Sequence, residues 1–150
     1  MNVKVLCGRV LFVIGLGFAL GGLAPQAAAG PSASVPSSIP NGRSIFQKGK
    51  DLHGVQIIAQ KPPLFPSCAS CHRTNGAGGM HLPGGAVSAD LRHAALVTHQ
   101  KHPYTITLLE RAISTGIDNA GKPLDPVMPR WRLSKQDLQD VSFYVLTQLK

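Results

Sequence analysis

The spacing of hydrophobic and polar positions predicts three helices separated by long loops. The first is expected over residues 42–52, although Gly49 weakens the pattern in its interior. The second is expected over residues 105–116 and should end at Gly116. Its apolar stripe consists of Leu108, Leu109, Ala112 and Ile113.

The clearest helical pattern lies at the carboxyl end, over residues 133–150. Ser134 is a suitable N-cap, and Asp137 follows three residues later, as in a capping box. One apolar face then continues to the end of the chain. It consists of Leu138, Val141, Val145 and Leu149.

The segments between these helices are rich in glycine and proline. Residues 73–85 read RTNGAGGMHLPGG, and residues 116–131 read GIDNAGKPLDPVMPRW. Neither is compatible with regular structure, and no alternating run predicts a strand. We therefore expect an all-α fold of three to four short helices. Its core of side chains is thin for its length, so another group is expected to fill the centre.

The amino terminus has the pattern of a secretory signal peptide. Lys4 and Arg9 precede fifteen uncharged residues, 10–24, and Ala27 and Ala29 supply a small-x-small cleavage site. An uncleaved membrane anchor is the alternative, but a span needs about 20 apolar residues. We therefore expect a signal peptide at residues 1–29.

The rest of the chain is expected to divide into a linker and one folded domain. Residues 30–41 are rich in proline and serine and predict a flexible linker. Residues 42–150 then form the domain.

Basic residues outnumber acidic ones 15 to 7 in the whole chain, and the signal peptide removes only two of them. In an exported protein this excess favours an acidic protein partner or a membrane surface over nucleic acid. The periplasm is the expected location.

The stretch CASCH, from Cys68 to His72, is the strongest chemical motif. A thioredoxin-like dithiol would lie in a βαβ pattern, which is absent around it. A zinc site would need further ligands, for which only His99 and His102 have a suitable spacing. The third interpretation is covalent haem attachment, for which C-x-x-C-H is the pattern: two thioether bonds through Cys68 and Cys71, and a bond from His72 to the iron.

Several segments together resemble the class I (mono-haem) c-type cytochromes of the bacterial periplasm. Gly42 and Phe46 resemble the first-helix pair of that family, and Val141 and Tyr144 resemble the last-helix positions that receive it. CHRTNGAGGM is similar to the loop after the haem motif, and DPVMPRW resembles the methionine loop. The resemblance implies the cytochrome c fold, wrapped around one covalent haem c per chain.

The resemblance also implies the axial ligands, His72 and Met128. Met80 is the rival methionine, and bis-histidine ligation is a further alternative. The remaining histidines are His53, His81, His93, His99 and His102. The family often has PDL where this chain has ADL, residues 89–91, so the carbonyl that orients the His72 ring is open, with Pro83 as a candidate.

An iron with both axial positions filled transfers single electrons and does not bind a substrate. The resemblance therefore implies an electron-transfer protein with no catalytic residues of its own. The pocket is expected to be dried by Leu108, Ile113, Val127, Leu138 and Val141. A basic rim for an acidic redox partner is expected from Arg73, Arg130, Arg132 and Lys135.

Two other functions compete with a diffusing electron carrier. The domain is alternatively a haem c subunit of a membrane-bound dehydrogenase or terminal oxidase, in which case an exposed apolar patch is expected. A haem enzyme or gas sensor is the third alternative, and it requires an open or displaceable axial position.

Overall fold

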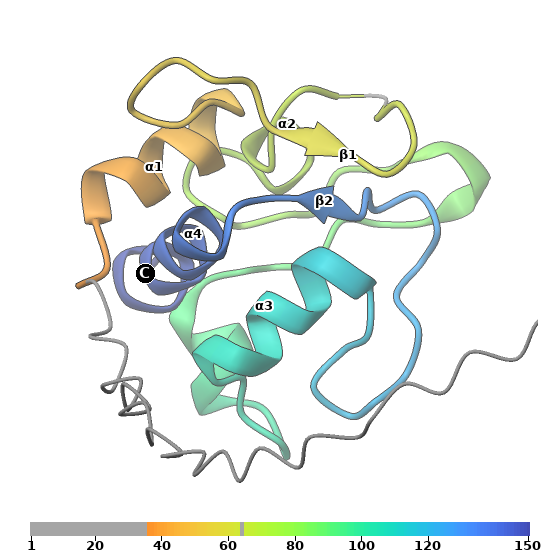
Figure 1. The fold of residues 1–150 in the computed structure, drawn as a ribbon. Helices are drawn as coiled ribbons and strands as arrows, with labels where there is room; N and C mark the ends of the chain where they lie inside the picture. The colour runs from red at the N-terminus through yellow and green to blue at the C-terminus, as the bar shows by residue number, and fades with distance from the viewer. Residues whose placement is uncertain (1–35, 64) are drawn as a thin grey trace, which may run out of the picture. The chain divides into compact units, whose positions relative to one another are not determined.

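The computed structural model describes residues 36–63 and 65–150, which contain four α-helices and one small sheet (Figure 1). The predicted signal peptide and linker residues 30–35 lie outside the described residues. The elements are α1 (Ile39–Lys48), β1 (Ile58–Ala59), α2 (Ala69–His72), α3 (Ile106–Thr115), β2 (Trp131–Arg132) and α4 (Lys135–Gln148). A 3-10 turn at Pro83–Gly85 and a π-type turn at Ala94–Thr98 lie between α2 and α3. In the described part of the chain, no helix has both the length and the apolar character needed to cross a bilayer.

The predominantly helical fold is confirmed, but helix α1 begins and ends earlier than predicted. Its N-cap is Ser38, whose hydroxyl accepts a hydrogen bond from the Asn41 N–H at 3.3 Å. Pro40 is tolerated because the N–H groups of the first helical turn have no partner within the helix. Gly49 ends the helix in the left-handed conformation, with φ of 68°. The predicted range 42–52 was therefore wrong at both ends, and the linker prediction was wrong for residues 39–41.

Helices α3 and α4 lie where the sequence predicts them. Thr105 caps α3, and Gly116 ends it in the left-handed conformation. The Ser134 hydroxyl caps α4 by accepting the Asp137 N–H at 3.1 Å. Both helices therefore begin at a residue whose side chain caps the first turn, and α3 ends at a glycine whose backbone freedom permits the left-handed cap.

Helices α1 and α4 cross at Gly42. A Cβ atom on this residue would overlap the backbone carbonyl of Asp140 and lie 2.7 Å from Cβ of Tyr144. The rings of Phe46 and Tyr144 pack beside this crossing, with centroids 5.7 Å apart. The resemblance of Gly42, Phe46, Val141 and Tyr144 to a first- and last-helix pair is thus confirmed, since all four lie at one buried interface.

The small sheet was not predicted from the sequence. Strands β1 and β2 pair antiparallel, with Ile58 opposite Arg132 and Ala59 opposite Trp131. Two residues per strand are too few to produce an alternating pattern, so the sequence carried no strand signal. The pairing joins the chain that follows α1 to the chain that leads into α4 (Figure 1).

Candidate functional site

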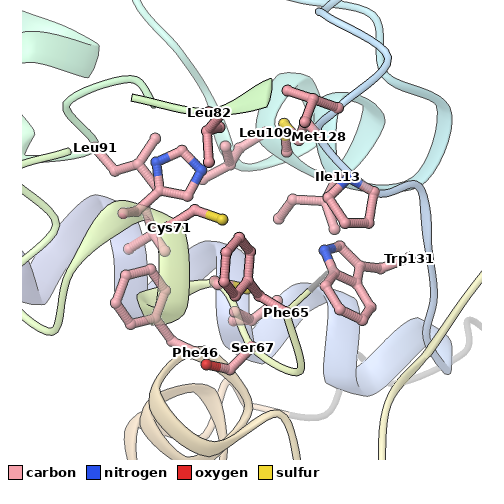
Figure 2. Close-up of a pocket in the computed structure, with 16 residues that line it drawn as sticks. Phe46, Phe65, Ser67, Cys71, Leu82, Leu91, Leu109, Ile113, Met128 and Trp131 are labelled. Carbon is pink, nitrogen blue, oxygen red and sulfur yellow. The ribbon is translucent and has the colours of Figure 1, made fainter. Parts of the chain in front are cut away.

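An apolar cavity lies between the helices and the loops of the domain. The space between its walls is about 710 Å³ when its open mouth toward solvent is counted. Cys68, Cys71 and His72 line it from α2 and its N-cap, and Met128 lines it from the loop before β2. Figure 2 shows the sulfur of Cys71 pointing into the cavity, and Met128 on a different wall.

The C-x-x-C-H motif forms a single helical turn. The His72 N–H donates to the Cys68 carbonyl at 2.9 Å, so both cysteines and the histidine belong to one local unit. The Ser88 hydroxyl supports this turn by donating to the Cys71 carbonyl at 2.8 Å. Neither cysteine takes part in a disulfide.

The environment of the two thiols is unlike that of a redox dithiol. Desolvation raises the pKa of Cys68 to about 12, and the pKa of Cys71 is also raised by desolvation. A reactive C-x-x-C pair instead has a lowered thiol pKa, which supplies the attacking thiolate. The site therefore favours attachment of a group over thiol–disulfide exchange.

The His72 ring is oriented by the carbonyl of Ala89. Its Nδ1 lies 2.8 Å from that oxygen, and a carbonyl only accepts, so Nδ1 carries the proton and Nε2 is left with a lone pair. Desolvation lowers the pKa of His72, partly offset by this hydrogen bond, which favours the neutral imidazole that a metal requires. The candidate Pro83 was therefore wrong, because the first residue of ADL provides the carbonyl.

The methionine loop presents Val127, Met128 and Pro129 to the cavity. A turn at Asp125 shapes it: the Asp125 carboxylate accepts the Val127 N–H at 2.8 Å, and the Asp125 carbonyl accepts the Met128 N–H at 3.1 Å. The loop is also joined to the chain that follows β1. The Gln60 N–H, directly after β1, donates to the Arg130 carbonyl, directly before β2, at 2.8 Å.

The apolar lining was only partly predicted. Ile113, Val127 and Val141 line the cavity, whereas Leu108 and Leu138 do not. Leu109, which follows Leu108 on α3, and Val145, which lies on the same predicted apolar face of α4 as Leu138, line the cavity as well. The apolar stripe of this helix includes both Leu108 and Leu109, so the sequence pattern does not show which of these two leucines points toward the cavity.

Several other lining residues had no predicted role in the pocket, among them Phe46, Phe65, Leu82, Leu91 and Trp131. Most come from loops, where no periodicity shows which side chains turn inward. The sequence could have indicated a role for Trp131. Burial of a tryptophan is unfavourable unless its indole N–H finds a hydrogen-bond partner, so a tryptophan beside the methionine loop suggests a polar partner in the pocket. Figure 2 shows its indole nitrogen directed toward the cavity, where it is available to a polar atom of a bound group.

The rival ligands do not line this cavity. Met80 lies elsewhere, and its N–H donates to the Ser88 hydroxyl at 2.9 Å. None of the five remaining histidines lines the cavity either, and Nδ1 of His93 is bonded to the Leu146 carbonyl at 2.8 Å. Among residues 36–63 and 65–150, no three His, Cys, Asp or Glu side chains lie close enough together to hold a metal ion.

The four basic residues of the expected rim differ in environment. Arg73, Arg132 and Lys135 are exposed. Arg130 is half-buried, and its guanidinium donates to the carbonyls of Leu124 and Met128. It is therefore engaged with its own loop.

The donor set fits a covalently attached haem. Two protonated thiols on one turn suit thioether formation, an imidazole with a free Nε2 lies beside them, and a thioether sulfur lines another wall. Aromatic and aliphatic side chains form most of the remaining lining, which suits a large flat apolar group. The sequence profile of the cytochrome c family matches residues 41–148. No curated protein sequence matches the chain.

Proposed function

The chain belongs to the cytochrome c family, and we propose that it is a mono-haem class I member that carries single electrons in the periplasm. Proteins of this family transfer electrons through covalently bound haem c. The observation that carries the proposal is the shared cavity of Cys68, Cys71, His72 and Met128.

The bound haem supplies an iron that gains and loses one electron at a time. Cys68 and Cys71 would hold it through thioether bonds, and His72 would bind the iron through Nε2 while Ala89 fixes the plane of the ring. Met128, which lines the same cavity, would supply the second ligand to the iron. A thioether ligand raises the reduction potential relative to a second histidine, and axial ligands as a class move haem potentials over about 0.8 V.

Replacement of Met128 tests the proposed ligation. In M128A we expect a lower reduction potential, loss of the weak red absorption band of methionine-bound ferric haem c, and rapid binding of cyanide or carbon monoxide. Met80→Ala is the matched control, because Met80 lies outside the cavity and should leave all three unchanged. An unchanged spectrum in M128A would transfer the ligand role to Met80 or to a histidine.

The same measurements separate an electron carrier from a haem enzyme or gas sensor. If Met128 closes the axial position, the untreated ferrous protein resists carbon monoxide. Rapid binding by the wild-type protein would instead favour the sensor or enzyme.

The charges of the domain support an acidic redox partner. Most carboxylates are engaged locally: Asp140 is buried, Asp51, Asp118 and Asp125 accept backbone N–H groups in turns, and Asp137 bonds the α4 cap. In residues 36–63 and 65–150 the salt bridge present is Arg92–Asp90. Most exposed basic side chains in the described part of the chain therefore form no ion pair.

Salt tests the electrostatic part of the proposal. Electron transfer to an acidic partner should slow steeply between about 10 mM and about 1 M salt, because screening over this range shortens the Debye length from about 30 Å to about 3 Å. R73Q, R132Q and K135Q should each reduce the salt dependence. A rate that stays flat across the range would exclude steering by these residues.

A membrane-associated subunit is the second candidate, and one surface feature favours it. Leu52, Val55 and Ile58 are 58%, 63% and 64% exposed and lie within one short stretch before and in β1. Exposed apolar side chains that gather together are typical of a contact surface. This candidate is tested by separating cells into soluble periplasmic and membrane fractions and locating the protein in each by haem staining. The wild-type protein is compared with the serine variants L52S, V55S and I58S. Recovery in the soluble periplasmic fraction, with a mature terminus near residue 30, supports the diffusing carrier. Membrane recovery that the serine variants abolish supports the subunit.

A further inference from the structure

Arg130 follows Met128 by two residues, and its guanidinium binds the backbone of the loop that carries Met128. Nη2 donates to the Leu124 carbonyl at 2.9 Å. Nη1 donates to the Met128 carbonyl and lies 3.4 Å from the Asp125 carbonyl. One side chain therefore contacts three carbonyls from both ends of the loop.

The guanidinium of Arg130 packs against the carboxyl end of helix α3. A Cβ atom on Gly116 would overlap Nε, Cζ and Nη2 of Arg130, so the guanidinium rests directly on the bare Cα of that glycine. Gly116 is the C-cap of α3, with φ of +73°, and its carbonyl accepts the Leu124 N–H at 2.8 Å. A cation is favoured at this place because the carbonyl end of a helix carries partial negative charge.

The loop needs such a donor because its own sequence prevents regular hydrogen bonding. Pro126 and Pro129 lack N–H groups, so the loop cannot pair its carbonyls within itself as a helix would. A planar guanidinium has several donors in fixed directions, which suits carbonyls that converge from different parts of a turn. A lysine ammonium retains the charge but not this fork.

We propose that Arg130 is a positioning residue that clamps the Met128 loop to the end of α3 and thereby slows exchange of Met128 for an external ligand. The part that concerns exchange rests on the proposed His72 and Met128 ligation. Arg130 itself does not contact the iron site, because Val127, Met128 and Pro129 are the members of this loop that line the cavity.

Arg130→Lys separates positioning from charge. Cyanide binding to the ferric R130K protein should be on the order of tenfold faster than in wild type, since at least one hydrogen bond from a charged donor is lost. The red methionine band should weaken. The control Arg43→Lys concerns an exposed arginine on α1 and should change neither readout. A wild-type rate and band in R130K would overturn the proposal.

A pair of glycine variants tests the same contact from the other side. Gly116→Ala places a methyl group where the guanidinium lies and should reproduce the faster cyanide binding of R130K. Gly121→Ala is the matched control, because its φ of +83° imposes a similar backbone strain while no atom lies within 4 Å of the added Cβ. If both variants bind cyanide at the same rate, strain explains the effect and the clamp is refuted.

Hydrogen exchange separates failure of the clamp from failure of the proposed ligation. The N–H groups of Leu124 and Met128 are hydrogen-bonded in the structure and should exchange faster in R130K than in R43K. This readout does not depend on a bond from Met128 to iron. A wild-type protein without the methionine band would refute the ligation, and faster loop exchange in R130K would still support the clamp. Unchanged loop exchange would overturn it.

Discussion

The two walls that face each other across the haem pocket are built in different ways. The His72 wall is one helical turn of five consecutive residues, closed by a backbone hydrogen bond from His72 to Cys68 and braced by Ala89 and Ser88. The Met128 wall is a loop without regular structure, shaped by a turn at Asp125 and contacted by the Arg130 side chain.

This difference indicates that the two walls have different roles: the His72 wall would attach the haem, and the Met128 wall would set its reduction potential. The His72 wall would hold the haem by two covalent bonds and one iron ligand, all within one hydrogen-bonded helical turn. The Met128 wall would contribute one weak ligand from a loop held by a few hydrogen bonds. Loss of the first wall should therefore remove the holoprotein, whereas loss of the second should change its chemistry.

The largest expected effect comes from replacing His72. His72→Ala should cause almost complete loss of folded, haem-stained protein, because the apolar side chains that line the cavity lose the group that they would pack against. M128A should yield holoprotein in nearly normal amount. The measurements are haem staining of periplasmic extracts and circular dichroism of the purified protein.

His99→Ala is the control, since His99 is an exposed histidine outside the cavity. Equal losses in H72A and M128A would contradict the contrast between the walls. A fully folded, haem-free H72A protein would contradict the idea that the haem completes the core.

The next largest effect should come from the scaffold that both walls share. Gly42→Ala forces a methyl group onto the Asp140 carbonyl, so α1 and α4 must move apart at about 1–3 kcal/mol or more. Urea unfolding of the holoprotein measures this cost. Arg43→Ala, on the exposed side of the same helix, should cost little. A near-neutral G42A would show that the two helices adjust more readily than the contact suggests.

The sequence predicted best the features that are local. The C-x-x-C-H turn, the Ser134 cap and the end of α3 at Gly116 each depend on neighbouring residues, so their patterns are visible along the chain. The crossing at Gly42 joins distant residues and was found through family resemblance. No property of Gly42 alone reveals what packs against it.

The features that sequence reasoning missed arise from long-range contacts between irregular segments. The backbone carbonyl of Ala89 is hydrogen-bonded to His72. Every residue type has such a carbonyl, so the role of Ala89 cannot be recognised from its residue type. From the sequence, Arg130 is predicted to be a charged residue on the surface, whereas in the structure its side chain is hydrogen-bonded to the loop backbone. Trp131 and Phe65 turn into the cavity from segments without periodicity.

A smaller effect should come from Ser88, which braces the His72 wall. Ser88→Ala leaves the Cys71 carbonyl and the Met80 N–H without the hydroxyl that joins them, at a cost of about 1–3 kcal/mol. Ser142→Ala is a matched control, because its hydroxyl is buried without a hydrogen-bond partner in the described part of the chain. Urea midpoints should fall in S88A and stay level or rise in S142A. Equal changes would mean that the Ser88 brace contributes nothing beyond burial.

The smallest effect concerns Asp90, which follows the carbonyl that orients His72. Its carboxylate bonds the Arg92 guanidinium at 2.5 Å, and this hydrogen bond, aided by the charge of Arg92, lowers the pKa of Asp90 below its ordinary 3.8. Because the folded-state pKa is the lower one, the stabilisation is present above pH 3.8 and is lost as the pH falls through the folded-state value. Both side chains are partly exposed to solvent, which screens the pair, so Asp90→Asn should cost little stability at neutral pH. The difference in urea midpoint between wild type and D90N should shrink in acid and in high salt. A large difference that persists in acid would mean that Asp90 supports the His72 wall through its backbone segment, which would make that wall less local than the helical turn indicates.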